Sequence, residues 1–336
     1  MVSECFEQIW QDLEMHARDT SGEGILTLRV LPDSAFDFYL GVHHPQTLRT
    51  LLIRVSRENV MNQSSFPHSK GFEIRQTVLP EDGKRSVTIL LIPNGERYQE
   101  IFSRLAEDVV SNCSNQTSER AMIKALLLRL EMWHQFMDRF GPDGLNPAEQ
   151  RGLYGEIRFI HDYLIPHLGP GLAVAAWTGP QRKPQDFQLA GMAVEVKTSI
   201  AGQHQVMHIA GEQQLDDTGL EALYLWHLSL RELRDGGRTL PEIVDAVRDV
   251  IRDEAGVSSA FEGLLIMAGY LDEHREKYET GYADRSASIF HVRDGFPRIT
   301  ERSLISGVGD VRYSVTLAAC SQFRVSDETL VAAIKG

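Results

Sequence analysis

An acidic and a basic residue stand two positions apart in the stretch PQDFQLAGMAVEVKTS. Residues 192–199 have the composition of a strand, so Glu195 and Lys197 are predicted to share one of its faces. Asp186 lies in a short strand before it, and residues 189–191 can form a hairpin turn that brings its carboxylate beside Glu195. Two adjacent carboxylates repel each other unless a cation lies between them, and Mg²⁺ favours such oxygen ligands. The pattern predicts a metal-dependent phosphodiester hydrolase site in which Lys197 orients or helps deprotonate the attacking water.

A third carboxylate, Glu156, is predicted on the inward face of a helix. Asn146 at the N-cap and Glu149 three residues later form a capping-box start. At 3.6 residues per turn, Glu156 shares its face with apolar residues such as Leu153 and Ile160. Because a buried charge is costly without a partner, we expect a metal ion or a lysine close to Glu156.

The order of these groups along the chain resembles that of the PD-(D/E)XK nuclease superfamily, whose core is a mixed sheet flanked by helices. The matching pattern is an inward Glu156, then Pro184-x-Asp186, then Glu195-Val-Lys197. More narrowly, the runs GLYGEIRFI, DF…VEVKTS and HI…EQQL resemble the bacterial "PD-(D/E)XK motif protein" family of phage-defence gene clusters. That match covers most of the chain, with its specific motifs in residues 152–215. One departure is that Gln185 separates the proline from Asp186.

The resemblance implies roles for individual residues. Asp186 and Glu195 would be ligands of Mg²⁺ or Mn²⁺, Lys197 the catalytic lysine, and Glu156 an additional acid that orients metal-bound water or binds a second metal. Gln214 matches a polar position that commonly lies near such sites. DNA is the implied substrate, and ATPase or helicase-like subunits of a defence complex are the implied partners.

Four further residues are weaker candidates for DNA contact or site support. Arg182 and Lys183 precede the motif and could touch a phosphate, although two basic residues in a loop are also typical of a solvated loop. His208, with His204 on the same face of the following strand, could point toward the site, but strand histidines commonly have structural roles. Gln214 itself could be an ordinary surface residue of a short helix, and Glu195 with Lys197 could be a solvated ion pair.

Hydrophobic periodicity predicts an α+β to α/β protein, and the resemblance implies that its core is restriction-endonuclease-like. Strands are expected at 25–30, 36–42, 47–56, 71–79 and 86–93, with turns such as Asp82-Gly83 between them, and helices dominate residues 96–140. After the helix that carries Glu156, we expect strands at 172–178, 186–189, 192–199, 204–209 and 222–230, a short helix at 211–217, and a capped helix from Thr239. The predicted domains are a β-rich N-terminal domain (1–112), a helical connector (113–145), a nuclease core (146–230) and a C-terminal α/β extension (231–336).

Composition limits the cellular setting and the class of partner. Thirty-four basic and 47 acidic residues give a net charge of −13, which opposes binding of nucleic acid, although residues 146–215 are near neutral with five basic and six acidic residues. Three scattered cysteines, no signal-peptide pattern and no apolar run of membrane-spanning length lead us to expect a cytoplasmic protein without membrane contact.

The clustered residues thus predict a Mg²⁺-dependent DNA endonuclease, and the resemblance implies that it is a subunit of a bacterial anti-phage, restriction-like system. Weak, salt-sensitive DNA binding by the isolated chain is expected, with partner subunits delivering the substrate. A homodimer or two sequential nicks would be needed to cut both strands. Two alternatives stay open: a non-catalytic or conditionally active scaffold subunit, and a structure-specific repair or recombination nuclease.

Overall fold

The computed structural model describes residues 2–60, 62, 65–79, 85–200 and 206–336. The chain divides into two compact units, Met1–Gly144 and Leu145–Gly336. The predicted turn at Asp82-Gly83 and His204 lie outside the described residues. All four principal candidate residues belong to the second unit.

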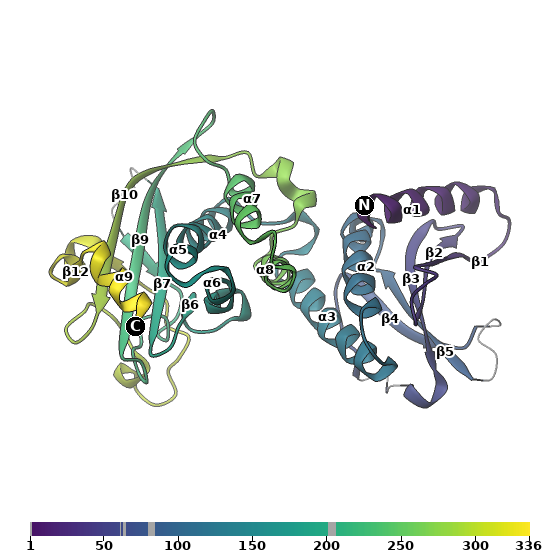
Figure 1. Ribbon diagram of the computed structural model, residues 1–336, viewed down its shortest axis with the longest axis horizontal. Coiled ribbons are helices and arrows are strands. Elements are labelled where there is room, and N and C mark those ends of the chain that lie inside the picture. The colour runs from purple at the N-terminus through teal and green to yellow at the C-terminus, as the bar shows by residue number, and fades with distance from the viewer. Residues whose placement is uncertain (1, 61, 63–64, 80–84, 201–205) are drawn as a thin grey trace. The chain divides into compact units, whose positions relative to one another are not determined.

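The first unit contains an antiparallel five-stranded sheet with the order β1-β2-β3-β5-β4 (Figure 1). Its strands are β1 (Gly24–Val30), β2 (Asp37–His44), β3 (Leu48–Ser56), β4 (Phe72–Thr77) and β5 (Ser86–Pro93), and its helices are α1 (Val2–Asp19), α2 (Gln99–Ser114) and α3 (Glu119–Arg139). Helix α1 packs on β2, and α2 packs on β3. The sequence pattern predicts these five strands but not α1, which begins a region predicted to be β-rich.

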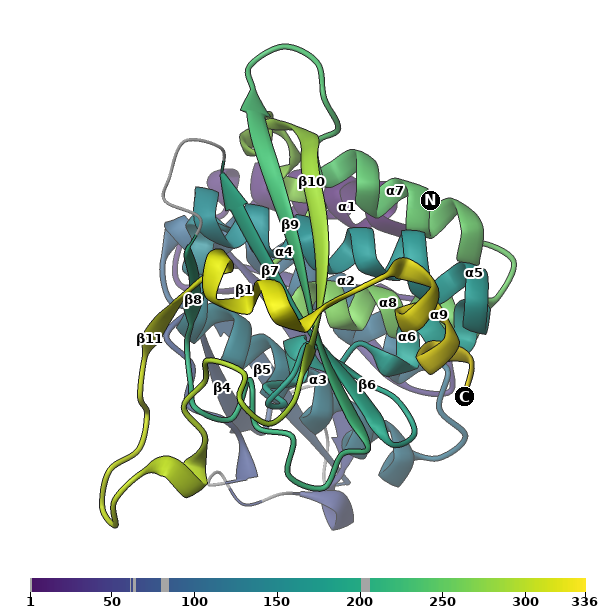
Figure 2. The same ribbon diagram turned by 90° about the vertical axis from the view of Figure 1, so that its left-hand side faces the viewer.

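The second unit contains a mixed five-stranded sheet with the order β12-β10-β9-β7-β6 (Figure 2). Its strands are β6 (Phe187–Gln188), β7 (Met192–Ile200), β9 (Ala222–Leu233), β10 (Gly281–Val292) and β12 (Arg324–Val325), and a separate pair is formed by β8 (Val206–Ile209) and β11 (Tyr313–Thr316). Strands β7 and β9 run parallel, whereas the other neighbouring pairs are antiparallel. The protein is therefore of the mixed α+β class, and strands from beyond residue 230 complete the sheet that carries Glu195.

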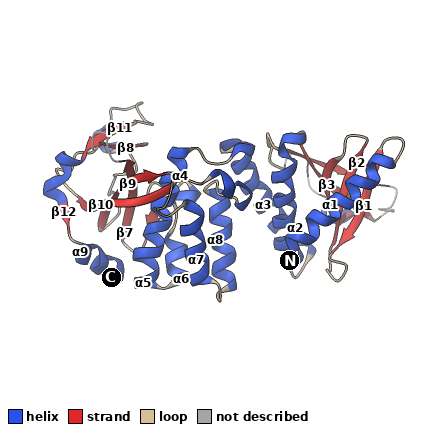
Figure 3. Ribbon diagram, turned by 90° about the horizontal axis from the view of Figure 1, so that it is seen from above, coloured by secondary structure: helices blue, strands red, loops and turns tan. Residues whose placement is uncertain are grey.

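Helices gather on one side of this sheet (Figure 3). They are α4 (Pro147–Phe159), α5 (Ile165–Leu168), α6 (Pro170–Ala176), α7 (Leu240–Ile251) and α8 (Ala255–Met267); a π-helical turn η6 (Ile160–Leu164) links α4 to α5, and α9 (Asp327–Lys335) ends the chain. Helix α4 begins with the predicted capping box of Asn146 and Glu149, and α7 begins with another at Thr239.

Two predicted elements are wrong. Residues 172–178 are predicted as a strand but fall largely in helix α6, because Pro170 occupies its first turn and the alanines that follow favour helix. Residues 211–217 are predicted as a helix but form successive turns. The long strand β10 is absent from the prediction, since its exposed stretch around residues 284–287 is polar and lacks an alternating pattern.

Gly155 lets α4 approach β7 closely. A Cβ added at Gly155 would overlap the Cγ2 atom of Thr198 and lie 3.3 Å from Val196 Cγ1. This close approach sets the position of Glu156, the next residue in the helix.

We expect Gly155→Ala to lower the free energy of unfolding by about 2 kcal/mol, because the helix must move away from the strand. Chemical denaturation measures the change. Adding Thr198→Ser removes the overlapping methyl group and should restore most of the loss. Gly152→Ala is the control in the same helix: its added Cβ meets nothing within 4 Å, so helix propensity should make it neutral or slightly stabilising. A Gly155→Ala protein as stable as Gly152→Ala would contradict this account of the packing.

Candidate active site

The hairpin predicted from the motif is present and places Asp186 beside β7. Phe187 pairs with Val194 in the β6–β7 register, and Gly191 in the turn adopts a φ of +74°. The Oδ2 atom of Asp186 accepts a hydrogen bond of 2.8 Å from the backbone N–H of Val196. Asp186 is therefore held between Glu195 and Lys197 along the strand.

Glu195 and Lys197 form a tight ion pair on the same face of β7. Lys197 Nζ lies 2.6 Å from Glu195 Oε1, and the side chain of Glu195 is completely buried. Lys197 also donates to Gln214 Oε1 at 3.1 Å, and that oxygen accepts a second bond of 2.8 Å from the backbone of Ala210. Gln214 is thus brought to the site, although from a turn rather than the predicted helix.

Glu156 approaches the same cluster from α4. Its Oε2 atom accepts a hydrogen bond of 2.7 Å from Trp177 Nε1. A Cβ built on Gly179 would lie 3.2 Å from that Glu156 oxygen and 3.0 Å from Asp186 Oδ1. A side chain at position 179 would therefore fill the space that the two carboxylates border.

The electrostatics of the cluster are those of three acids around one lysine. Burial, followed by the charge of Asp186, raises the pKa of Glu195 to about 8. The pKa of Glu156 is raised for the same two reasons, and burial raises that of Asp186. The pKa of Lys197 is also raised: burial alone would lower it, but the surrounding carboxylates favour its charged form. Three buried acids that resist ionisation lie beside a single lysine, and a further cation would stabilise their charged forms.

The carboxylates of the cluster suit a divalent metal ion that is bound partly by water. Among the described residues, no three histidine, cysteine, aspartate or glutamate side chains are grouped to hold a metal ion. Mg²⁺, however, is commonly bound by one or two carboxylates and several waters. The buried Oε2 atom of Glu195 has no hydrogen-bond partner, and Gly179 leaves space beside Asp186. These features fit a cation bound by two carboxylates and water, not an all-protein cage.

The other three of the weaker candidates are exposed. Arg182 and Lys183 are exposed in the loop after the short helix η7 (Gly179–Gln181), and Arg182 adopts a left-handed φ of +60°. His208 is exposed on β8, where its Nδ1 atom is 2.9 Å from Ser314 Oγ of β11. Among the described residues, none of these three makes a hydrogen bond or an ion pair with the four principal residues.

Gln185 is a site-supporting residue that the sequence pattern treats only as an interruption of the motif. It is buried, and its Nε2 atom donates to the backbone oxygen of Gln213 at 2.9 Å. Gln185 therefore ties the segment before Asp186 to the turn that carries Gln214. Its position directly before Asp186 is the only feature of the sequence that points to a role at the site. No sequence pattern points to Trp177 or Gly179, because their contacts with the site depend on the fold.

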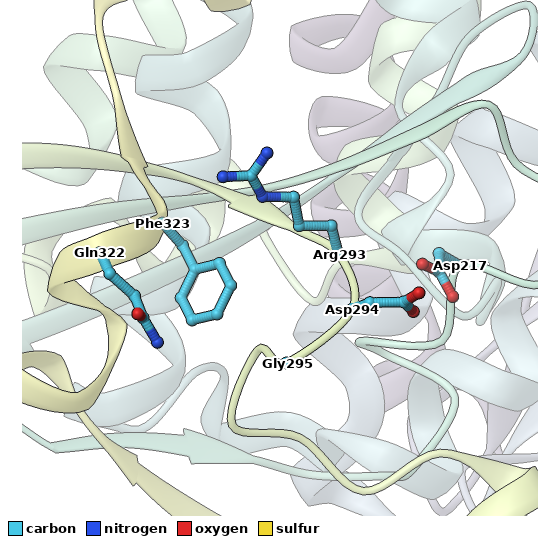
Figure 4. Close-up of a pocket in the computed structure, with 6 residues that line it drawn as sticks. All are labelled: Asp217, Arg293, Asp294, Gly295, Gln322 and Phe323. Atoms are coloured by element: carbon cyan, nitrogen blue, oxygen red, sulfur yellow. The ribbon is translucent and has the colours of Figure 1, made fainter.

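A pocket of about 720 Å³ lies apart from these groups (Figure 4). Its lining residues are Asp217, Arg293, Asp294, Gly295, Gln322 and Phe323. The carboxylates of Asp217 and Asp294 face each other, while the guanidinium of Arg293 points away from them. None of the candidate residues lines it.

The hairpin aspartate, the strand Glu-x-Lys and the helix glutamate lie together on a mixed sheet, as the PD-(D/E)XK pattern in the sequence leads us to expect. The family described as "Putative PD-(D/E)XK family member (DUF4420)" matches residues 6–318, and the chain belongs to that family. No curated protein and no solved structure gives a match. In the described part of the chain, no helix has the length and hydrophobicity that crossing a membrane requires.

Proposed function

We propose that this protein is a Mg²⁺- or Mn²⁺-dependent DNA endonuclease and a subunit of a bacterial anti-phage, restriction-like complex. The observation that carries the proposal is the buried Glu195–Lys197 pair beside Asp186, with Glu156 on the other side of the space at Gly179. Family membership supports the phosphodiesterase chemistry.

Asp186 and Glu195 would hold the metal, which when bound acidifies a water and neutralises charge on the phosphate. Asp186 is already oriented by the Val196 N–H, so it needs little rearrangement to bind. The ammonium of Lys197, fixed by Gln214, supplies a positive charge and a proton donor next to the phosphate. Glu156, fixed by Trp177, can accept a proton from water because its raised pKa makes it a stronger base than an exposed glutamate.

The charge distribution supports dependence on partners. With a net charge of −13, the chain has little electrostatic attraction for DNA outside the site. We therefore propose that ATPase or helicase-like subunits deliver the substrate, and that the isolated chain binds DNA weakly at physiological salt.

The test is cleavage of plasmid DNA by the purified protein in Mg²⁺ or Mn²⁺, alone and with the products of neighbouring genes. Nicking or cutting that EDTA stops, and that Asp186→Ala and Lys197→Ala each abolish, is the expected result. Thermal melting of each variant checks that it is folded. Unchanged cleavage in both variants would overturn the site.

The scaffold alternative is favoured by one observation: Lys197 is directly paired with Glu195, and such a pair can serve the fold as well as a metal site. Such a subunit would join the same complex without cutting. A protein that binds its partners and Mn²⁺ but cuts no DNA in any assembly would establish it.

Duplex, single-stranded, flapped and junction substrates, compared in the same assay, decide whether the enzyme is instead a structure-specific repair nuclease.

A further inference from the structure

Two rows of polar residues continue from Lys197 across the sheet. In the register of β7, β9 and β10, Lys197 is level with His227, and His227 is level with Ser288. The next row on the same face consists of Ser199, Ser229 and Ser286. Adjacent strands are about 4.8 Å apart, so this polar surface begins one strand away from the candidate lysine.

Apart from Glu195, the rest of this sheet face is apolar and covered. Ala193, Leu223, Leu225 and Phe290 pack into a core with residues of β8, β11 and the 3-10 helix η10 (Leu317–Phe323). The change from apolar to polar residues occurs midway along the same strands. A polar half next to a packed half is therefore a specific feature of the sheet, because packing alone would favour apolar residues throughout.

The polar half forms the floor of a cavity of about 250 Å³. Its lining residues are His227, Ser229, Ser286, Ser288, Phe290, Leu317, Ala318, Ser321 and Arg324. Helix η10 lies beside β9 and β10 at this point (Figure 2). Although the chain is strongly acidic, none of these lining residues is an aspartate or a glutamate.

The polar groups of the cavity suit an anion that accepts hydrogen bonds. The hydroxyls of Ser229, Ser286, Ser288 and Ser321 make no hydrogen bond within the described residues, so they are available to a ligand. Arg324 is exposed at the rim. Hydroxyl and guanidinium groups are the usual protein partners of DNA phosphates.

His227 is oriented rather than free to change charge. Its Nε2 atom is 2.9 Å from Ser199 Oγ, and burial lowers the pKa of the imidazole to about 4. The ring is therefore neutral near pH 7 and serves as a hydrogen-bonding group on the cavity floor.

We propose that this Ser/His/Arg cavity binds the sugar-phosphate backbone of DNA next to the cleavage site. The proposal rests on the proposed nuclease function, since it assumes that the strand passing Lys197 continues over β9 and β10. The volume suits one phosphate with its sugar, so the cavity positions the strand and does not read bases.

The test is binding of a labelled DNA duplex and of the corresponding single strand to the full chain at low salt in EDTA, where cleavage cannot occur. Arg324→Ala removes the charge, and Ser321→Tyr fills the cavity from the exposed helix without touching the core. Each variant is expected to weaken binding about 5- to 10-fold. Arg324→Ala should also reduce the slope of log affinity against log salt by about 1, as expected for one lost phosphate contact.

The matched control is Arg252→Ala, which removes an equally exposed arginine of the same unit at the end of α7 and should leave affinity and slope unchanged. If the wild type binds and cuts DNA but both cavity variants behave like Arg252→Ala, the cavity assignment is overturned while the nuclease function stands. If the wild type neither binds nor cuts DNA, alone or with its partners, both are overturned. Thermal melting verifies that each variant is folded.

Discussion

A Glu195→Gln protein is expected to be at least about 100-fold slower in metal-dependent DNA cleavage, yet more stable than the wild type at high pH. The activity loss follows because even groups that only orient metal ligands contribute 10- to 100-fold, and Glu195 is proposed to be a ligand itself. The stability gain follows because a fully buried carboxylate, with one oxygen lacking any hydrogen bond, no longer has to be charged.

The raised pKa of Glu195 determines at which pH the Glu195→Gln protein is more stable than the wild type. The pKa of Glu195 rises from 4.5 to about 8 on folding, so the folded protein binds more protons than the unfolded chain between those values. The contribution of Glu195 to wild-type stability should therefore be most favourable at low pH and fall as the pH rises from about 4.5 to about 8. Glu195→Gln lacks this titration and should exceed the wild type by about 4 kcal/mol at pH 9 while matching it near pH 5.

Chemical denaturation at pH 5 and pH 9, in EDTA, measures the difference. The exposed Glu276→Gln is the control and should change stability little at either pH. Adding Mn²⁺ should raise the melting temperature of the wild type at pH 8 and leave that of Glu195→Gln nearly unchanged. A Glu195→Gln protein that is less stable than the wild type at pH 9 would show that the ionised carboxylate stabilises the fold.

Such a trade of stability for a charged group separates the two main functional hypotheses. A scaffold has no use for an ionised carboxylate that costs folding energy, whereas a metal site requires one. The unsatisfied Glu195 oxygen, the space at Gly179 and the clustered acids therefore favour the enzyme on physical grounds.

The parts of the site that the sequence predicts are those set by local geometry. Strand alternation places Glu195 and Lys197 on one face, and a three-residue turn places Asp186 opposite, because both depend only on neighbouring residues. The helical period likewise predicts that Glu156 faces inward among apolar residues. No knowledge of the remaining chain is needed for these placements.

The parts that sequence analysis misses depend on contacts between distant segments. The apolar run 172–178 is ambiguous between strand and helix, and only the fold shows that it carries Trp177 to Glu156. Gln185 is polar and unremarkable in the sequence, but the turn at Gln213 approaches it and makes it a buried link. Strand β10, which supplies half of the polar cavity floor, has an exposed polar stretch that resembles a loop.

Removing Lys197, the other member of the ion pair, should change the free energy of unfolding at high pH in the opposite direction. Lys197→Met is expected to abolish cleavage and to lower the free energy of unfolding by about 3 kcal/mol at pH 9, because Glu195 Oε1 then remains buried without its partner. Near pH 5 the loss should shrink to less than about 1 kcal/mol, since Glu195 can bind a proton there and needs no counter-charge. The exposed Lys277→Met, with the same change of side chain, is the control and should have little effect at either pH.

The double variant Glu195→Gln, Lys197→Met tests whether the two stability changes have one common cause. If the loss in Lys197→Met comes from an unpaired buried charge, replacing that charge by an amide should recover most of the stability at pH 9, and the two effects should be strongly non-additive. Purely additive effects would mean that the lysine stabilises the fold through its packing alone. Cleavage should remain absent in the double variant, because the ammonium and the carboxylate are both required at the phosphate even when the fold no longer needs either of them.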